Sequence, residues 1–192
     1  MDRSTTTFAG SLVGHKTLKI MVEGTVLYPG CGHEHVPFWF TGKETRLDID
    51  ATCEPDIVAS ITDMGDIGEF DNIYTSHTLE HLYQFDVPLA LAEFLRVLKP
   101  GGAAIIVVPD LEGVNCDDVV LYESLAGPIC GRDLFYGLTE YVKMSPFYAH
   151  HTGFVKETLQ EAMTKAGFLE VSITRMKDHS LMGVGKKPKE QK

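Results

Sequence analysis

Apolar residues gather in short runs along this chain, and each run is followed by polar or turn-forming residues. Runs of this length predict strands, and they lie at residues 26–28, 45–49, 57–61, 72–75 and 103–108. The last run is apolar throughout, which is typical of a strand that a parallel sheet buries on both faces. The pattern therefore predicts a sheet with covered central strands.

Two other segments carry apolar residues with the period of a helix. Residues 91–98 place Leu and Phe at i, i+3, i+4 and i+7, between a cap at Asp86 and a stop at Pro100-Gly101-Gly102. Residues 159–166 repeat this spacing and end at Gly167, a residue that often terminates helices. These segments predict two amphipathic helices that cover the sheet.

The C-terminal part of the chain alternates apolar and polar residues at 169–173, and residues 181–184 suit a strand that returns beside them. The whole pattern predicts an α/β fold with βαβ repetition and an antiparallel finish. We find no internal repeat and no linker, so residues 1–192 are expected to form one domain.

A glycine turn follows the first predicted strand. Tyr28-Pro29-Gly30-Cys31-Gly32 brings bare backbone close to a ligand, because glycine has no side chain to obstruct the contact. Asp48 lies sixteen residues beyond Gly32, after the next strand, where an acidic residue can accept hydrogen bonds from a ribose. The two features predict a nucleotide-type pocket.

Composition narrows the class of protein. With 44% hydrophobic and 23% charged residues, the chain has the composition of an ordinary globular domain. The net charge of −10 disfavours a long contact with nucleic acid. We expect a cytoplasmic protein without a membrane span, because neither a signal core nor a long apolar run is present. The four cysteines are widely spaced and suggest neither disulfides nor a zinc site.

Six segments, in this order, resemble class I S-adenosylmethionine-dependent methyltransferases, and within them the small bacterial type 11 enzymes. They are VLYPGCG (26–32), RLDID (46–50), SITD (60–63), FDNIYTSHTLEHL (70–82), LAEFLRVLKPGG (91–102) and AIIVVPDLEG (104–113). The resemblance implies a Rossmann-like, doubly wound, mostly parallel seven-stranded sheet with an antiparallel final strand. It implies S-adenosyl-L-methionine as cofactor, S-adenosyl-L-homocysteine as product, and a small-molecule O or N atom as methyl acceptor.

The resemblance also implies which residues contact the cofactor. Gly30 and Gly32 would admit its methionine part, Asp48 would bind the ribose and Asp63 would accept from the adenine amino group. The full set is Tyr28, Gly30, Cys31, Gly32, Glu34, Asp48, Ile49, Asp63, Met64, Ser76 and His77. Tyr28 replaces the usual acidic residue, and Glu34 replaces the usual third glycine. We therefore expect Glu34 or a backbone carbonyl to receive the cofactor's amino group.

Residues 114–153 follow the last core segment and are too long for a plain turn. They hold eight aromatic or imidazole side chains: Tyr122, Phe135, Tyr136, Tyr141, Phe147, Tyr148, His150 and His151. We expect this insertion to form the acceptor side of the site. A packed helical excursion with aromatics in the core is the alternative.

Transfer would be an in-line displacement at the sulfonium methyl, which needs positioning more than acid–base chemistry. Where a base is needed, His77 and His150 are the candidates, because histidine titrates near neutrality. The alternative function is a non-catalytic cofactor-binding or assembly protein. DNA methylation is disfavoured, since no Asp-Pro-Pro-Tyr motif follows residues 72–75. A homodimer is left open.

His77-Thr78-Leu79-Glu80-His81 also fits the H-x-x-E-H pattern of zinc peptidases. That chemistry requires the motif to lie inside a helix, and here it starts directly after a predicted strand. No metal is therefore expected. His33-Glu34-His35 are read as polar loop residues.

Overall fold

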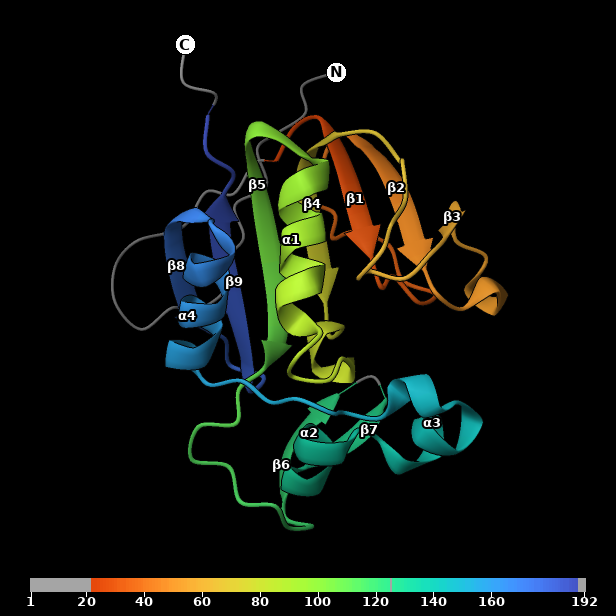
Figure 1. Ribbon diagram of the computed structural model, residues 1–192. Helices are drawn as coiled ribbons and strands as arrows, with labels where there is room; N and C mark the ends of the chain where they lie inside the picture. The colour runs from red at the N-terminus through yellow and green to blue at the C-terminus, as the bar shows by residue number, and fades with distance from the viewer. Residues whose placement is uncertain (1–21, 125, 190–192) are drawn as a thin grey trace, which may run out of the picture.

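The computed structural model describes residues 22–124 and 126–189. Its centre is a seven-stranded sheet in the order β3-β2-β1-β4-β5-β9-β8 (Figure 1). Neighbouring strands from β3 to β5 run parallel, and β9 runs antiparallel to both β5 and β8. The strands are β1 Thr25–Pro29, β2 Lys43–Asp48, β3 Ile57–Val58, β4 Phe70–Ser76, β5 Leu98–Pro109, β8 Leu169–Arg175 and β9 Ser180–Lys186. The predicted fold class is confirmed.

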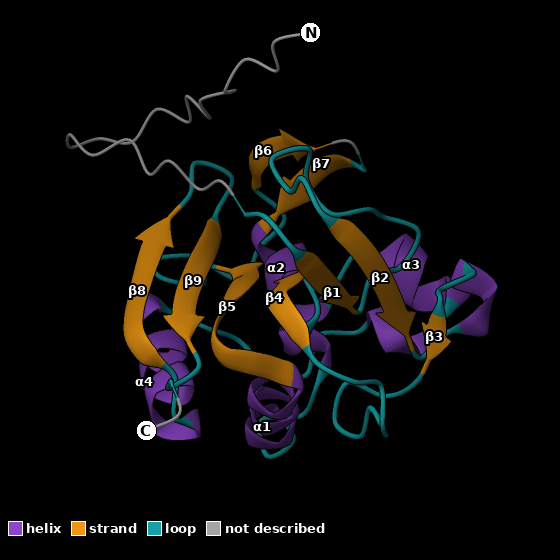
Figure 2. Cartoon of the chain, turned by 90° about the horizontal axis from the view of Figure 1, so that it is seen from above, coloured by secondary structure: helices purple, strands orange, loops and turns teal. Residues whose placement is uncertain are grey.

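Helices α1 (Val87–Val97) and α4 (Lys156–Ala166) lie side by side on one face of this sheet (Figure 2). Their apolar stripes bury Phe94 and Met163 in the larger core cluster. Strand β9 admits α4 closely because Gly183 has no side chain, and a Cβ there would lie 2.7 Å from the Met163 sulfur. Both predicted amphipathic helices are present in the structure.

The opposite face of the sheet is covered differently. Within the described residues, the connections between β1, β2, β3 and β4 contain no α-helix, only the short 3₁₀ turn η1 (Ala51–Cys53). Trp39 and Phe40 from the β1–β2 loop pack instead on Tyr74, with ring centroids 5.8 and 5.6 Å away. Tyr28 completes this second cluster with an edge contact to Tyr74 at 5.1 Å.

The segment after β5 forms a separate layer at the carboxyl ends of the strands (Figure 1). It contains β6 Val120–Ser124, β7 Gly127–Cys130, α2 Gly131–Tyr136, α3 Thr139–Met144 and the 3₁₀ turn η3 Pro146–Tyr148. The chain leaves the sheet at Asp110 and returns at Phe154, and these two residues form a parallel bridge. The returning segment also donates to the Glu80 carbonyl, from the amides of His151 and Thr152 at 2.8 and 3.1 Å.

One predicted strand is much shorter than expected. Strand β3 covers only Ile57–Val58, whereas the apolar run extends to residue 61. The Ala59 amide still donates to the Asp48 carbonyl, but Ser60 then starts a turn in which its carbonyl accepts from the Asp63 amide at 3.1 Å. The side chain of Ile61 is buried by this turn and not by a ladder, which explains its apolar character.

Candidate active site

The carboxyl ends of β1 and β2 are joined by a closely bonded glycine turn. The amides of Gly30 and Cys31 donate to the Leu47 carbonyl at 2.8 and 3.2 Å. Asp48 fixes the other side of the turn, because its Oδ2 accepts from the Gly32 amide at 2.8 Å. Its Oδ1 accepts from the Asp50 amide at 2.9 Å. Asp48 is thus oriented by two backbone groups, with further lone pairs available to a ligand.

The two glycines of the turn have different tasks. Both have positive φ, +69° at Gly30 and +50° at Gly32, a region that disfavours residues with a Cβ. A Cβ on Gly30 would lie 2.1 Å from Thr78 Cγ2, so Gly30 makes room for Thr78. Nothing lies within 4 Å of the corresponding position on Gly32. The open space that a ligand needs is therefore at Gly32.

Arg46 stabilises the glycine turn through hydrogen bonds to its carbonyls. This role was not predicted from the sequence. Its guanidinium donates to the carbonyls of Gly32 at 2.6 Å and Glu34 at 3.1 Å. It also donates to the carbonyls of Cys53 and Glu54, both at 3.1 Å. A basic residue two positions before Asp48 is the only signal in the sequence. The arginine joins the first turn to the segment after β2.

The remaining predicted residues of the first turn differ in exposure. Tyr28 is buried against Tyr74, and burial raises the pKa of its hydroxyl well above the usual value. Burial raises the pKa of the Cys31 thiol to about 11, so that thiol is neutral at pH 7. Glu34 is exposed, as is Ile49 after β2. Of these four side chains, only those of Glu34 and Ile49 are open to contact with a ligand.

Asp63 and Met64 lie on the turn after β3. Asp63 is exposed, while Met64 is buried and its amide donates to Glu93 Oε2 at 2.8 Å. Glu93 in turn pairs with Arg96, and Arg96 donates to the Gly65 carbonyl at 2.7 Å. Helix α1 therefore holds this turn at the side of the sheet where β2 and β3 end.

Ser76 and His77 stand at the carboxyl end of β4. His77 has a positive φ of 51°, and its amide donates to the Val107 carbonyl at 2.9 Å. The neighbouring Thr78 donates to the Gly30 carbonyl at 3.2 Å, which places the ends of β1 and β4 in contact. The structure thus brings the glycine turn next to the end of β4, where His77 stands, and ligands bind at strand ends of this kind in open α/β sheets.

The His77 ring is 45% exposed, and its Nδ1 lies 3.2 Å from Oε1 of the buried Glu80. Burial would lower the pKa of His77, but the neighbouring Glu80 carboxylate outweighs burial and raises that pKa. Burial would likewise raise the pKa of Glu80, yet His77 holds it below its usual value. The motif from His77 to His81 forms a turn and the 3₁₀ segment η2 (Leu79–His81), not an α-helix.

The aromatic insertion divides into two parts at the site. Burial raises the pKa of Tyr148, and the charges of Cys53, Asp50 and Asp48 raise it further, so Tyr148 lies near the end of β2. His150 lies on the other side, with its ring 4.9 Å from that of His81. His151 stacks on Tyr83 at 4.4 Å, and Phe147 is 56% exposed. The four residues therefore do not form a single wall.

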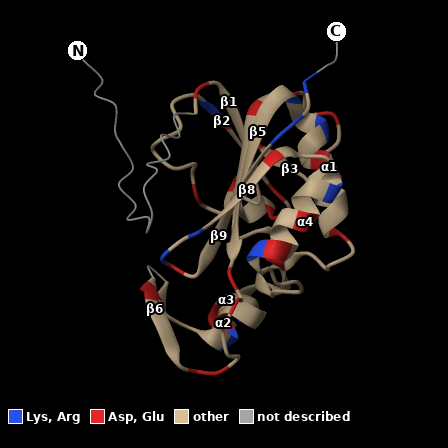
Figure 3. Cartoon of the chain, turned by 90° about the vertical axis from the view of Figure 1, so that its left-hand side faces the viewer, with Lys and Arg blue, Asp and Glu red and all other residues tan. Residues whose placement is uncertain are grey.

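Basic side chains are distributed over the molecule and mostly paired with acids. On the side of α4, β8 and β9, blue and red positions alternate (Figure 3). Lys165 pairs with Glu161, and Lys186 pairs with Glu170. No helix in the part of the chain that the structure describes has both the length and the apolar character needed to cross a bilayer.

Comparison with known proteins agrees with this geometry. A family model described as a methyltransferase domain matches residues 27–106, which contain the glycine turn, Asp48 and His77. A search of curated protein sequences finds no match.

Several solved structures share the fold at low sequence identity. A 1,6-didemethyltoxoflavin-N1-methyltransferase from Burkholderia thailandensis is 16% identical, with a TM-score of 0.56 over 87% of this chain and 72% of that one. The N-methyltransferase NodS from Bradyrhizobium japonicum, in complex with S-adenosyl-L-homocysteine, is 14% identical, with a TM-score of 0.55 over 86% and 78%.

Phosphoethanolamine N-methyltransferase 2 from Haemonchus contortus, in complex with S-adenosyl-L-methionine, is 11% identical, with a TM-score of 0.57 over 88% of this chain and 50% of that one. The sequence match shows a methyltransferase domain over residues 27–106, and the solved structures share the fold of the chain.

Proposed function

We propose that this protein transfers a methyl group from S-adenosylmethionine to an O or N atom of a small molecule. One observation carries the proposal: the glycine turn locked by Asp48 meets the end of β4, with Thr78 bonded to the Gly30 carbonyl. In open α/β sheets, ligands bind at strand carboxyl ends of this kind. The family match over the same residues supports a cofactor there.

The residues at the turn fit the cofactor. The open space at Gly32 would take its amino acid part, and the Asp48 carboxylate would accept hydrogen bonds from the ribose hydroxyls. Exposed Ile49 and Asp63 would flank the adenine on the β2 and β3 side. When bound, S-adenosylmethionine supplies an electrophilic methyl group on a positively charged sulfur.

The chain's own residues would mainly position the acceptor. His77 exposes its ring beside the glycine turn, and it is the residue that we assign to the acceptor at the β4 end. The insertion 114–153 covers this end of the sheet and would exclude water. Holding the acceptor atom in line with the methyl group lowers the barrier by several kcal/mol. The role of His77 and His150 as bases stays a prediction.

The distribution of charge on the surface favours a small-molecule acceptor over a nucleic acid. The paired acids and bases, with a net charge of −10, offer no basic face for a nucleic acid backbone among the described residues. Two of the enzymes named above, the didemethyltoxoflavin and the phosphoethanolamine methyltransferase, act on small molecules according to their names, which agrees with this class of acceptor. A homodimer and a cytoplasmic location stay predictions.

The proposal is tested in two steps. Isothermal titration with S-adenosylhomocysteine measures cofactor binding by the purified protein. Incubation of the protein with methyl-labelled S-adenosylmethionine and a metabolite extract of the native cells, followed by mass spectrometry, then identifies any labelled acceptor. Label in a small molecule supports the enzyme. Tight cofactor binding without label in any fraction would favour the non-catalytic alternative.

A further inference from the structure

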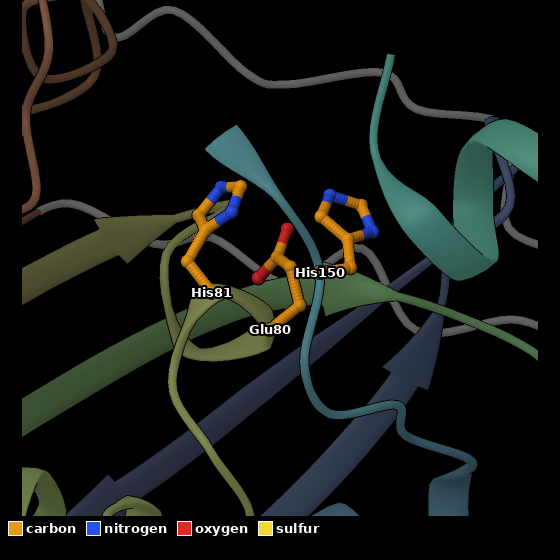
Figure 4. A group of neighbouring side chains, drawn as sticks. All are labelled: Glu80, His81 and His150. Carbon is orange, nitrogen blue, oxygen red and sulfur yellow. The ribbon is translucent and has the colours of Figure 1, made fainter. Parts of the chain in front are cut away.

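We propose that Glu80, His81 and His150 bind a divalent transition-metal ion at the carboxyl end of β4. Each residue offers one ligand atom, and the three atoms lie within 4.8 Å of one another. Figure 4 shows the Glu80 carboxyl group between the two imidazole rings. Glu80 and His81 belong to η2, whereas His150 comes from the segment that returns from the insertion.

Both imidazoles are oriented by backbone carbonyls. His81 Nδ1 lies 3.2 Å from the Ala149 carbonyl oxygen, and His150 Nδ1 lies 2.9 Å from the Leu134 carbonyl oxygen. A carbonyl can only accept, so each Nδ1 carries the proton. In the neutral form of either ring, the lone pair is then on Nε2. This arrangement is the one that fixes the tautomer and direction of histidines that bind metals.

The Glu80 carboxylate between the rings lacks the hydrogen bonds that buried carboxylates usually have. Glu80 is 1% exposed, and neither of its oxygens has a hydrogen-bond partner among the described residues. Within the same part of the chain, its only ion pair is with His77 Nδ1 at 3.2 Å. A buried carboxylate with unsatisfied oxygens destabilises a protein unless a cation lies beside it.

Ligand atoms of two imidazoles and a carboxylate thus lie around one space. Three acceptors repel each other unless a positive charge lies between them. Ligand atoms bound to one tetrahedral zinc ion at about 2.1 Å are separated by roughly 3.4 Å. The three ligand atoms here all lie within 4.8 Å of one another, and rotations of the side chains would bring them to the distances that an ion requires. The space therefore suits an ion better than a direct hydrogen bond.

The donor set indicates which ions fit. Two imidazoles and one carboxylate bind zinc in catalytic sites that keep a position open, and the same set binds manganese, iron or cobalt. Magnesium prefers oxygen ligands and is not expected to compete. The site differs from the zinc peptidase pattern, because His77 contacts Glu80 and is replaced as a ligand by His150.

The position of the proposed metal site suggests a role for the ion in binding the methyl acceptor. It lies one turn after His77, on the side where the insertion covers the sheet. If the proposed function holds, the open position of the ion would take an oxygen of the acceptor. Binding of the ion itself does not depend on that function, because all three ligands belong to the protein.

The test measures metal binding directly. The full chain, prepared without a polyhistidine tag, is stripped with a chelator and dialysed, then titrated separately with Zn²⁺, Co²⁺, Mn²⁺ and Mg²⁺. We expect one Zn²⁺ or Co²⁺ ion to remain bound per chain after desalting, and Mg²⁺ to be lost. Bound Co²⁺ should show the visible absorption of nitrogen and oxygen ligands. Absence of stoichiometric binding by every transition metal would overturn the proposal.

Variants locate the site. Glu80→Gln keeps the side-chain volume and removes the charge, and His150→Gln removes one ligand. We expect both to weaken Zn²⁺ binding at least about 100-fold, more than loss of an outer partner usually does. His151→Ala is the matched control, because that histidine is adjacent but stacks on Tyr83. Equal binding by the wild type and both Gln variants would refute this location.

Folding is followed in parallel by circular dichroism. Zn²⁺ should raise the melting temperature of the wild type and of His151→Ala, because a ligand of the folded state stabilises it. It should leave the melting temperature of His150→Gln unchanged. If Glu80→Gln does not fold, the result for His150→Gln decides, since this residue lies on a loop outside the sheet. Failure of methyl transfer with intact metal binding would count against the proposed function alone.

Discussion

Thr78 occupies the space that a side chain on Gly30 would need. Its Cγ2 lies 2.1 Å and its Oγ1 2.6 Å from the position of a Cβ on that glycine, and its hydroxyl donates to the Gly30 carbonyl at 3.2 Å. The glycine that the sequence suggested as a ligand contact therefore serves first to pack two strand ends together. This contact aligns the first turn with the end of β4.

Gly30→Ala should destabilise the protein more than Gly32→Ala. Both alanines would adopt a positive φ, which costs roughly 1–2 kcal/mol, but only the first would also collide with Thr78. We expect a loss of about 3 kcal/mol or more for Gly30→Ala, as for other overpacked sites. Urea unfolding measures both values. The double variant with Thr78→Ala should recover part of the loss, and equal losses for the two glycines would contradict the packing role.

Asp48→Ala should weaken binding of S-adenosylhomocysteine. Removal of the carboxylate takes away the proposed ribose acceptor and also frees the Gly32 amide. A hydrogen bond to a charged group contributes about 1.5–3 kcal/mol, so we expect an affinity loss of roughly ten- to 150-fold. Isothermal titration gives the value. Asp118→Ala, in an exposed pair with Arg132, is the control, and an unchanged affinity in Asp48→Ala would exclude the ribose role.

Arg46→Lys should lower both stability and cofactor affinity, although the charge is kept. The arginine reaches four carbonyls from one planar group, whereas an ammonium cannot match that fork. We expect about 2 kcal/mol of lost stability, within the range for charged hydrogen bonds. Arg132→Lys should change the stability by less than about 0.5 kcal/mol, because its pair with Asp118 is exposed. Similar effects of the two variants in urea unfolding would contradict the role of Arg46.

Tyr148→Ala should reduce cofactor affinity, whereas Phe147→Ala should not. The charges that raise the pKa of Tyr148 come from Cys53, Asp50 and Asp48, so the phenol lies over the proposed ribose side. Phe147 is largely exposed and would affect the acceptor at most. Titration of the two variants with S-adenosylhomocysteine separates these roles. A larger loss of affinity in Phe147→Ala than in Tyr148→Ala would show that Phe147, and not Tyr148, contacts the cofactor.

The Asp71 carboxylate should make the free energy of unfolding depend on pH in the acidic range. Its hydrogen bond with Lys99, together with bonds from the Thr25 amide and hydroxyl, lowers the pKa of Asp71 well below its usual value. A pKa depressed by folding stabilises the protein above the unfolded value, and this stabilisation is lost as pH falls below it.

We therefore expect the urea midpoint to fall on acidification from pH 5 toward pH 2, and to fall less in Asp71→Asn. The difference between wild type and variant should be largest near neutral pH and should shrink at low pH. Asp71 is partly exposed, so salt will reduce the effect. Parallel curves for the two proteins at all pH values would show that the Lys99 pair does not set this dependence.

Much of the fold follows from local pattern. The runs at 26–28, 72–75 and 103–108 lie within β1, β4 and β5, and the helical spacing places α1 and α4. Pattern works here because the central strands are buried on both faces and each of the two helices is buried on one face. It fails for residues 59–61, where burial comes from a turn, and it gives no sign that Trp39 and Phe40 replace a helix on the second face.

The sequence predicted only those site residues whose proximity follows from the order of the strands. Gly32 and Asp48 lie near each other because parallel strands end at one edge, which the sequence order already implies. Arg46 was missed because its partners are carbonyls, which carry no signal in the side-chain sequence. Glu80 and His150 are 70 residues apart, and only the folded return of the insertion brings them together.

The bridge between Asp110 and Phe154 has a consequence for how the protein can change. The insertion leaves and rejoins the domain at one point, where the Leu111 amide donates to the Phe154 carbonyl at 2.9 Å. A loop whose ends meet can be lengthened at a cost of only about 0.6 kcal/mol per doubling of its length. The segment between these two residues could therefore be replaced by another of different length or sequence, while the sheet and the strand ends proposed to bind the cofactor stay unchanged.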